Sequence, residues 1–432
     1  MSKPPFQIDE TTTPRVTRAW VLHPDIKSDV DRRLPDHALA EAVSLARALP
    51  DLEVAGADVV PLKTVRAGML FGSGKIDEIK STLEAAEVEL VLVDGPVSPV
   101  QQRNLEKAWG VKLLDRTGLI LEIFSDRAAT REGVLQVEMA ALSYQRTRLV
   151  RAWTHLERQR GGLGFVGGPG ETQIEADRRA IDDQLVRLRR QLDKVIKTRA
   201  LHRAARAKIP YPIVALVGYT NAGKSTLFNR LTGAEVMAKD MLFATLDPTM
   251  RRVQLPDGPE IIMSDTVGFI SDLPTELVAA FRATLEEVLA ADVICHVRDI
   301  SHPETEAQAL DVEGIMTSLG VPSDRPTVEV WNKLDALPVD EADAMRARAA
   351  RDEDVFAISA LTGEGIDGLL AAITGKLQGQ KHETVLTLAF SDGKKRAWLF
   401  QHDLVSLEHQ NDDGFEITVR WTPQQEAQFE RL

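Results

Sequence analysis

Residues 218–225 read Gly218-Tyr219-Thr220-Asn221-Ala222-Gly223-Lys224-Ser225 and fit the pattern G-x-x-x-x-G-K-[ST]. The apolar run 213–217 before them predicts a buried strand, and the segment from Thr226 to Leu231 predicts the start of a helix. Glycines let such a loop curl until its backbone N–H groups point at phosphate oxygens, and the helix N-terminus adds positive potential. The stretch therefore predicts a phosphate-binding loop in which Lys224 reaches the β- and γ-phosphates and Ser225 ligates Mg²⁺.

Two short motifs favour guanine as the base. Asn332-Lys333-Leu334-Asp335 follows the expected strand 327–331 and matches N-K-x-D. The Asp335 carboxylate can accept hydrogen bonds from the N1–H and the 2-amino group of guanine, which adenine does not offer. Asn332 can bond the base edge and neighbouring loops, and the stem of Lys333 can lie over the ring. Ser359-Ala360-Leu361, after the expected strand 355–358, would supply a backbone contact to guanine O6. We therefore expect GTP or GDP, and a small-molecule kinase is disfavoured.

Two further segments are expected to respond to the γ-phosphate. Asp265-Thr266-Val267-Gly268 follows the apolar run 261–263 and fits D-x-x-G, so Asp265 would hold the Mg²⁺ shell through water and the Gly268 N–H would sense the γ-phosphate. Upstream lies the loop Phe243-Ala244-Thr245-Leu246-Asp247-Pro248-Thr249. Thr245 is preferred to Thr249 as the residue that closes over Mg²⁺. The expected metal ligands are Ser225, Thr245 and Asp265, and the expected catalytic residues are Lys224, Thr245 and Gly268.

The residue that follows the D-x-x-G motif is Phe269. Ras-like proteins place a water-orienting Gln at this position. Phenylalanine can neither orient nor deprotonate a water molecule. We therefore expect slow intrinsic hydrolysis and activation by a partner that orders the switch segments or supplies a group in trans. The alternative is a residue elsewhere in this chain, such as one from the N-terminal half.

The chain of 432 residues is too long for a single core, so several domains are expected. Apolar strands alternate with helical patterns through the N-terminal part, which predicts a parallel α/β unit. The expected parts are a disordered tail (1–17), an N-terminal α/β subdomain (18–131), a helical hairpin (132–209) with a Gly-rich loop (161–170), a GTP-binding domain with a parallel sheet (212–378), and a small α/β C-terminal domain (382–432).

The expected hairpin combines an apolar seam with a basic helix. Five apolar residues of its second helix recur at steps of 4, 3, 4 and 3: Ile181, Leu185, Leu188, Leu192 and Val195. Such an a/d seam predicts that two helices pair side by side. Residues 178–208 hold 11 Lys and Arg against three Asp, a net charge of +8 in a chain of net charge −13. This local excess favours contact with RNA over a merely solvated face. The Gly-rich loop is read equally well as a flexible finger or as a connector.

Composition excludes several classes of protein. The 44% apolar and 27% charged content is ordinary for a soluble globular protein. The single cysteine, Cys295, excludes an internal disulfide and fits a reducing compartment. Without an apolar run of 18 residues or a signal-peptide core, we expect a cytoplasmic monomer with no stable membrane insertion. The acidic net charge argues against wholesale nucleic-acid coating. Gly72-Ser73-Gly74-Lys75 is read as a helix-initiating turn, with a second phosphate site as the alternative.

With these motifs in place, the sequence resembles the HflX family, translation-factor-class GTPases related to the Obg group. The switch loop 243–249 is typical of the wider group, and the stretches 98–106, 115–117, 161–164 and 168–179 are more specific. The resemblance implies a GTPase that binds the large ribosomal subunit and its rRNA and, in its GTP form, splits stalled or idle ribosomes, notably after heat stress. The hairpin would contact rRNA, and its Gly-rich loop would reach toward the peptidyl-transferase region.

A second function is kept open beside this one. A regulatory GTP switch could bind a protein partner, with the hairpin as a coiled-coil docking site. Salt separates the two hypotheses, because binding to rRNA weakens steeply as salt rises and a packed apolar seam is much less sensitive.

Overall fold

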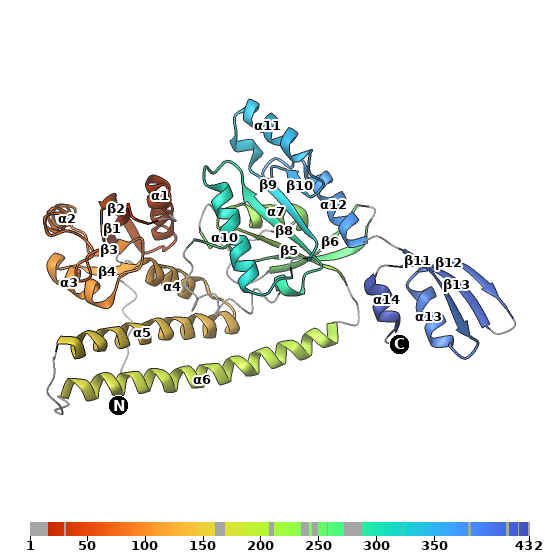
Figure 1. Ribbon diagram of the computed structural model, residues 1–432, viewed down its shortest axis with the longest axis horizontal. Coiled ribbons are helices and arrows are strands. Elements are labelled where there is room, and N and C mark those ends of the chain that lie inside the picture. The colour runs from red at the N-terminus through yellow and green to blue at the C-terminus, as the bar shows by residue number, and fades with distance from the viewer. Residues whose placement is uncertain are drawn as a thin grey trace, which may run out of the picture.

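The computed structural model describes residues 16–29, 32–159, 169–206, 211–234, 242–243, 249–256, 258–271, 287–322, 324–378, 382–411, 414–421 and 423–430. An N-terminal domain, a nucleotide-binding domain and a small C-terminal domain follow one another, and a pair of long helices runs along the first two (Figure 1). The expected α/β architecture with parallel sheets is confirmed. Most of the expected tail and of the Gly-rich loop, together with the switch loop 244–248, lies outside the described residues.

The N-terminal domain is built on a four-stranded parallel sheet of order β2-β1-β3-β4. Its strands are β1 (Thr17–Ile26), β2 (Leu52–Leu62), β3 (Leu90–Val93) and β4 (Lys112–Asp115). Its helices are α1 (Pro35–Ala46), α2 (Ser73–Ala85), α3 (Pro99–Trp109) and α4 (Arg116–Arg127). β1 begins at Thr17, which pairs with Leu52, so the strand includes the last residue of the segment expected to be a tail. α2 begins directly after Gly72, in agreement with the helix-initiating turn.

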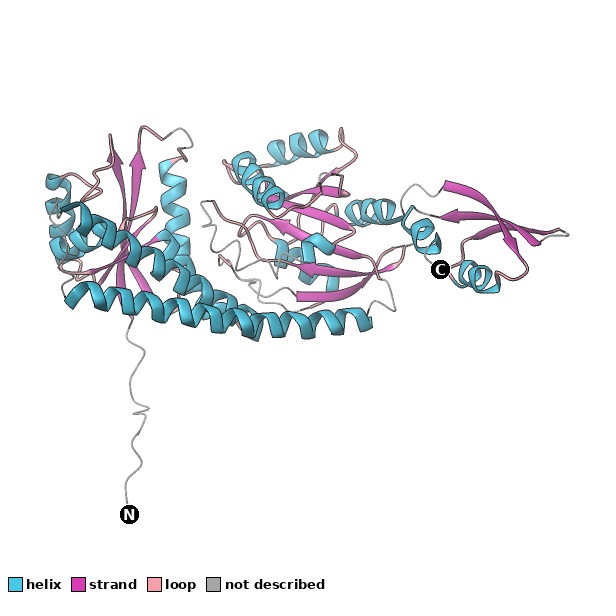
Figure 2. Cartoon of the chain, turned by 60° about the horizontal axis from the view of Figure 1, so that its bottom comes forward, coloured by secondary structure: helices cyan, strands magenta, loops and turns pink. Residues whose placement is uncertain are grey.

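The expected hairpin is a pair of helices, α5 (Arg131–Gln159) and α6 (Pro169–Arg206). They lie side by side in both views (Figures 1 and 2). Leu188 of the predicted seam is only 5% exposed. Polar pairs flank the seam, since Gln184 donates to Glu138 at 3.1 Å and Arg146 pairs with Asp182 at 2.8 Å. α6 continues past the end of α5 along the nucleotide-binding domain (Figure 1).

The nucleotide-binding domain has a six-stranded sheet of order β10-β9-β8-β5-β7-β6, in which only β6 is antiparallel to its neighbour. Its strands are β5 (Ile213–Gly218), β6 (Thr249–Gln254), β7 (Glu260–Asp265), β8 (Val293–Asp299), β9 (Thr327–Asn332) and β10 (Val355–Ala357). Its described helices are α7 (Lys224–Thr232), α10 (Thr305–Ser318), the 3₁₀ turn η1 (Leu334–Ala336), α11 (Val339–Ala349) and α12 (Ile366–Gln378). β5 is apolar and buried on both faces, as a central parallel strand requires. Cys295 lies fully buried on β8 as a small core residue.

The C-terminal domain is a three-stranded antiparallel sheet of order β11-β13-β12 with two helices. Its elements are β11 (His382–Ala389), α13 (Gly393–Gln401), β12 (Val405–Gln410), β13 (Gly414–Trp421) and α14 (Pro423–Glu430). Ile417, Val419 and Trp421 share the buried face of β13, where Phe429 of α14 covers them. Within the described ranges, the helices lack an apolar stretch long enough to cross a membrane.

Candidate nucleotide-binding site

The predicted phosphate loop joins the end of β5 to the start of α7. Gly223 precedes the helix with a φ of 91°, a conformation that glycine adopts without strain. A Cβ on Gly223 would lie 2.2 Å from Nδ2 of Asn332, and one on Gly218 would lie 2.1 Å from the carbonyl oxygen of Val297. These two positions therefore have no room for a side chain. The loop is packed tightly against β8 and against the end of β9.

Lys224 lies at the centre of the loop and is buried. Its Nζ donates hydrogen bonds to the carbonyl oxygens of Gly218, at 3.0 Å, and Tyr219, at 2.7 Å. Burial lowers the pKa of the ammonium to about 8, although the carboxylate of Asp265 opposes this shift. A nearby phosphate would favour the charged form, so bound nucleotide is expected to raise this pKa.

Nucleotide affinity is expected to fall as the pH rises above about 8, the pKa of Lys224 without nucleotide. Binding phosphate requires the ammonium form, so above that pH binding must take up a proton and affinity drops by up to about tenfold per pH unit. Calorimetric titration of GDP from about pH 7 to about pH 9.5, in buffers of different ionisation enthalpy, measures both the affinity and the proton uptake. A flat affinity profile with no proton uptake would contradict this expectation.

Two oxygen ligands suited to Mg²⁺ meet beside the loop. Ser225 at the start of α7 donates a hydrogen bond from Oγ to Oδ2 of Asp265, at the end of β7, over 2.7 Å. Magnesium prefers hard oxygen ligands and usually keeps waters and substrate phosphates in its shell. These residues fit such an ion. Among the described residues, His, Cys, Asp and Glu form no cluster of three or more that could hold a metal. Thr245 lies outside the described residues, and its competitor Thr249 opens β6 opposite Asp265.

Gly268 lies against the phosphate loop, as its expected role requires. A Cβ on Gly268 would lie 2.9 Å from Cα of Thr220 and 3.1 Å from Nζ of Lys224. A short bridge fixes the neighbouring backbone, because Thr220 N–H donates to the Phe269 carbonyl at 2.7 Å and Phe269 N–H donates to the Gly218 carbonyl at 3.1 Å. Gly268 thus lies beside the ammonium that would meet the γ-phosphate.

Asn332 connects the phosphate loop to the segment expected to contact the base. Its side-chain amide donates from Nδ2 to the Ala222 carbonyl at 2.8 Å, and its Oδ1 accepts from Ala360 N–H at 2.9 Å. It is only 2% exposed, so it acts here as a buried cross-link between loops. Arg230 of α7 strengthens the same connection by donating to the carbonyl oxygens of Ala360 and Leu361.

Asp335 is exposed, and Ser359 holds its carboxylate. Its Oδ1 accepts a hydrogen bond from Oγ of Ser359 at 2.5 Å. Lys333 adopts a positive φ of 69° and pairs with Asp299 at 2.7 Å, which holds its stem along the site. The structure therefore brings together N-K-x-D and 359–361, which are separate in the sequence. Contact of these residues with guanine stays a prediction.

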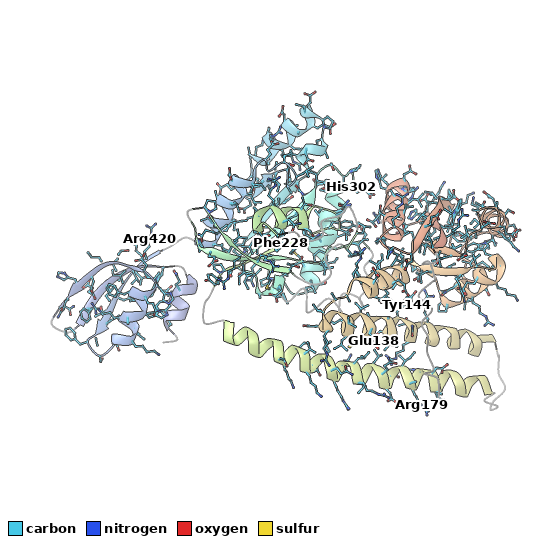
Figure 3. The ribbon with its side chains drawn as sticks, turned by 180° about the vertical axis from the view of Figure 1, so that it is seen from behind. Glu138, Tyr144, Arg179, Phe228, His302 and Arg420 are labelled. Atoms are coloured by element: carbon cyan, nitrogen blue, oxygen red, sulfur yellow. The ribbon has the colours of Figure 1, made fainter. Side chains whose placement is uncertain are left out.

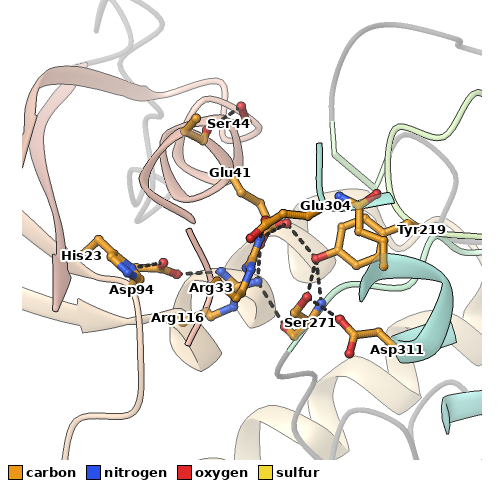
Figure 4. Close-up of polar contacts among 12 residues, drawn as sticks. His23, Arg33, Glu41, Ser44, Asp94, Arg116, Tyr219, Ser271, Glu304 and Asp311 are labelled. Carbon is orange, nitrogen blue, oxygen red and sulfur yellow. Dashed lines mark hydrogen bonds and ion pairs between the residues drawn. The ribbon is translucent and has the colours of Figure 1, made fainter. Parts of the chain in front are cut away.

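Several residues of the site contact the N-terminal domain, which the motifs did not predict. Phe269 is 2% exposed and belongs to the same apolar cluster as Phe124 of α4. The ring of Phe243, from the expected switch loop, packs edge-on against Phe124 with 4.7 Å between centroids. The hydroxyl of Tyr219 reaches Glu41 of α1 (Figure 4). The only sequence signal for these contacts was a bulky aromatic residue inside the phosphate loop, where the motif accepts any residue.

Models of known protein families match successive parts of the chain. Residues 36–125 match the model "GTP-binding GTPase N-terminal" and residues 127–206 match "GTP-binding GTPase Middle Region". Residues 213–333 match "50S ribosome-binding GTPase" and residues 344–432 match "HflX C-terminal domain".

Full-length relatives extend the similarity along the chain. GTPase HflX of Magnetococcus marinus is 50% identical over 402 residues, which cover 93% of this chain and 91% of that protein. GTPase HflX of Escherichia coli is 45% identical over 343 residues, 79% of this chain and 80% of that one. A solved GTP-binding protein from Sulfolobus solfataricus in complex with GDP is 21% identical, covering 83% of this chain and 97% of that one, with a TM-score of 0.44.

Proposed function

Since the chain belongs to the GTPase HflX family, we propose that in its GTP form it binds the large ribosomal subunit and separates stalled or idle ribosomes into their subunits. Binding of guanine nucleotide and hydrolysis of GTP follow from the family. The contact with rRNA, the splitting of ribosomes and a stimulation of hydrolysis by the ribosome are the proposal. The observation that carries it is the charge distribution on α6.

The exposed side of α6 carries a basic stripe, which we define as Arg187, Arg190, Lys194 and Lys197. These residues follow one another at steps of 3, 4 and 3, so they share one side of the helix. All four are exposed, whereas Leu188 on the seam is buried against α5. Arg179, about two turns before the stripe, is also exposed (Figure 3). A row of cations on a protein of net charge −13 is suited to the phosphate backbone of RNA.

The same geometry disfavours the regulatory switch that docks a protein through a coiled coil. The apolar seam of α6 would have to be available to that partner. Along the paired part of the helix, α5 already covers it, and the flanking pairs Gln184–Glu138 and Arg146–Asp182 close its edges. A ribosomal partner needs only the opposite, charged side.

In the proposed cycle, the nucleotide site distinguishes GTP from GDP. Lys224 and the loop N–H groups bind the phosphates. Mg²⁺ is held by Ser225, Thr245 and Asp265, and Asp335 recognises guanine by hydrogen bonds. Two observations support slow hydrolysis without a partner: Phe269 carries no group that can orient water, and its ring is buried. A ribosomal group or a reordered switch would complete the site. We further propose that the protein acts as a cytoplasmic monomer.

Sedimentation of intact ribosomes tests the proposal. Ribosomes incubated with the protein and a non-hydrolysable GTP analogue are expected to separate into small and large subunits on a sucrose gradient. With GDP, or without protein, they are expected to stay intact. Binding to isolated large subunits should weaken steeply between about 50 mM and about 200 mM salt. Intact ribosomes with the analogue at saturating protein would contradict the proposal. Salt-insensitive binding would favour the protein-partner switch.

A further inference from the structure

A buried polar network joins the N-terminal domain to the nucleotide site. We call Glu41, Arg116, Tyr219 and Ser271 the interdomain network (Figure 4). Arg116 directly follows β4 at the carboxyl edge of the N-terminal parallel sheet, and β1 lies there between β2 and β3. Open α/β sheets with such an order usually bind a ligand at this edge. Here the edge contacts the phosphate loop and the segment after Gly268.

Arg116 organises the N-terminal half of the network. Its guanidinium is 5% exposed and donates to Asp94 Oδ1 and to Glu41 Oε1, both at 2.6 Å. It also donates to the backbone carbonyl of Ser271 at 3.1 Å. Burial raises the pKa of Glu41, but Arg116 and Arg33 outweigh this effect and hold the pKa below its usual range. The network therefore contains a fixed carboxylate and a fixed cation.

Tyr219 organises the other half. Its hydroxyl donates to Glu41 Oε2 at 2.7 Å and accepts from the Ser271 N–H at 2.9 Å. Burial raises the pKa of this phenol, so it stays protonated and remains a donor. Ser271 is further anchored by its Oγ, which donates to Asp311 of α10 at 2.6 Å. Both backbone groups of Ser271 are thus held, one by Tyr219 and one by Arg116.

We propose that Tyr219 and Arg116 are positioning residues for the γ-phosphate. By holding the backbone of Ser271, three residues after Gly268, they keep Gly268 in its place beside Lys224 before nucleotide arrives. Preorganised donors bind more tightly than donors that must be ordered on binding. Only GTP has the γ-phosphate that meets the Gly268 N–H, so the network favours GTP over GDP. This inference rests on the proposed nucleotide site. It gives roles to Arg116, which lies outside the nucleotide motifs, and to Tyr219, which occupies a position of the phosphate loop where the motif accepts any residue.

The interdomain network couples nucleotide binding to the docking of the N-terminal domain. Glu41 and Arg116 belong to the N-terminal domain, whereas Tyr219 and Ser271 belong to the nucleotide-binding domain. Linkage requires that if the docked N-terminal domain favours GTP, then GTP equally favours the docked domain. A partner that pulls the N-terminal domain away would lower the affinity for GTP and leave the affinity for GDP nearly unchanged.

The test uses Tyr219→Phe in the full-length protein, with fluorescent GDP and a fluorescent non-hydrolysable GTP analogue. The variant keeps the ring in its buried place and removes the hydroxyl that contacts Glu41 and Ser271. We expect the affinity for the analogue to fall by roughly fivefold or more, with the GDP affinity within about twofold of the wild type. Glu41→Gln, at the other end of the same bond, is expected to shift the preference in the same direction. The double variant should bind the GTP analogue no more weakly than the more affected single variant, because both changes break the same chain of contacts.

Tyr144→Phe is the matched control. The Tyr144 hydroxyl also bonds a carboxylate, Asp115, at 2.5 Å, but it lies within the N-terminal half of the chain on α5. Tyr144→Phe should leave the ratio of the affinity for the GTP analogue to the affinity for GDP unchanged. Thermal unfolding of each variant identifies any loss from misfolding, which would weaken both nucleotides. Equal weakening of both nucleotides by Tyr219→Phe, or an unchanged ratio, overturns the inference. A wild-type protein that binds neither nucleotide overturns the proposed function itself.

Discussion

Replacing Asp335 by Asn is expected to lower the affinity for GDP by about a thousandfold. The Asp335 carboxylate is exposed and held by Ser359 at 2.5 Å, and we expect it to accept two hydrogen bonds from guanine. Asparagine presents one acceptor and one donor, so its NH₂ group would face the guanine 2-amino group. Xanthine carries a carbonyl oxygen there, so the variant should prefer xanthosine diphosphate. Titration of both fluorescent nucleotides measures the exchange of preference.

Ser359→Ala provides the control for this change. It keeps the carboxylate and its charge but removes the hydroxyl that orients it, so GDP binding should weaken only by roughly tenfold and guanine should remain preferred over xanthine. If Asp335→Asn binds GDP within about threefold of the wild type, then Asp335 does not read the base and the assignment of the N-K-x-D segment is wrong.

Reversing two charges of the basic stripe is expected to remove most binding to the large ribosomal subunit. Arg190→Glu combined with Lys194→Glu should lower the affinity roughly a hundredfold at low salt, because two phosphate contacts are lost and two repulsions appear. The slope of log affinity against log salt should also fall by about two. Sedimentation with isolated large subunits at several salt concentrations measures both quantities.

The matched control reverses two exposed arginines, Arg348→Glu in the last turn of α11 and Arg351→Glu just after that helix. This pair makes the same change in net charge at a site away from α6 (Figure 1). Subunit binding by the control should stay close to that of the wild type, and nucleotide binding should be unchanged in both double variants. Equal losses in the two double variants would show that only the net charge matters, and the assignment of rRNA contact to the stripe would fail.

The nucleotide site was readable from the sequence because its chemistry is local. A phosphate loop needs glycine at 218 and 223, and both lie within one run of eight residues. The groups that leave no room for a side chain there, on Val297 and Asn332, are distant in the sequence. The seam of α6 could be predicted for the same reason, since the 4-3 spacing of apolar residues around Leu188 directly indicates a side of the helix that packs against a partner. The parallel sheets followed from strands alternating with helices.

The contacts between domains were not readable from the sequence. Tyr219 and Glu41 are 178 residues apart, and nothing in either segment specifies the other as partner. The sequence pattern also does not single out α4 as a helix, because its residues 118–124 form a nearly continuous buried run without the periodicity of one apolar face. That run packs against both domains, and Phe124 is the residue that meets Phe243. Because so many of its residues are buried, α4 lacks the one-sided apolar pattern that would indicate a helix in the sequence.

GTP turnover by the purified protein, alone and with purified large ribosomal subunits at low and high salt, tests the central claim most directly. We expect a slow rate for the protein alone, because Phe269 is buried and cannot position water, and a strong stimulation by subunits that fades as salt rises. A fast rate without subunits, or intact GTP binding with no stimulation by them, would contradict the account.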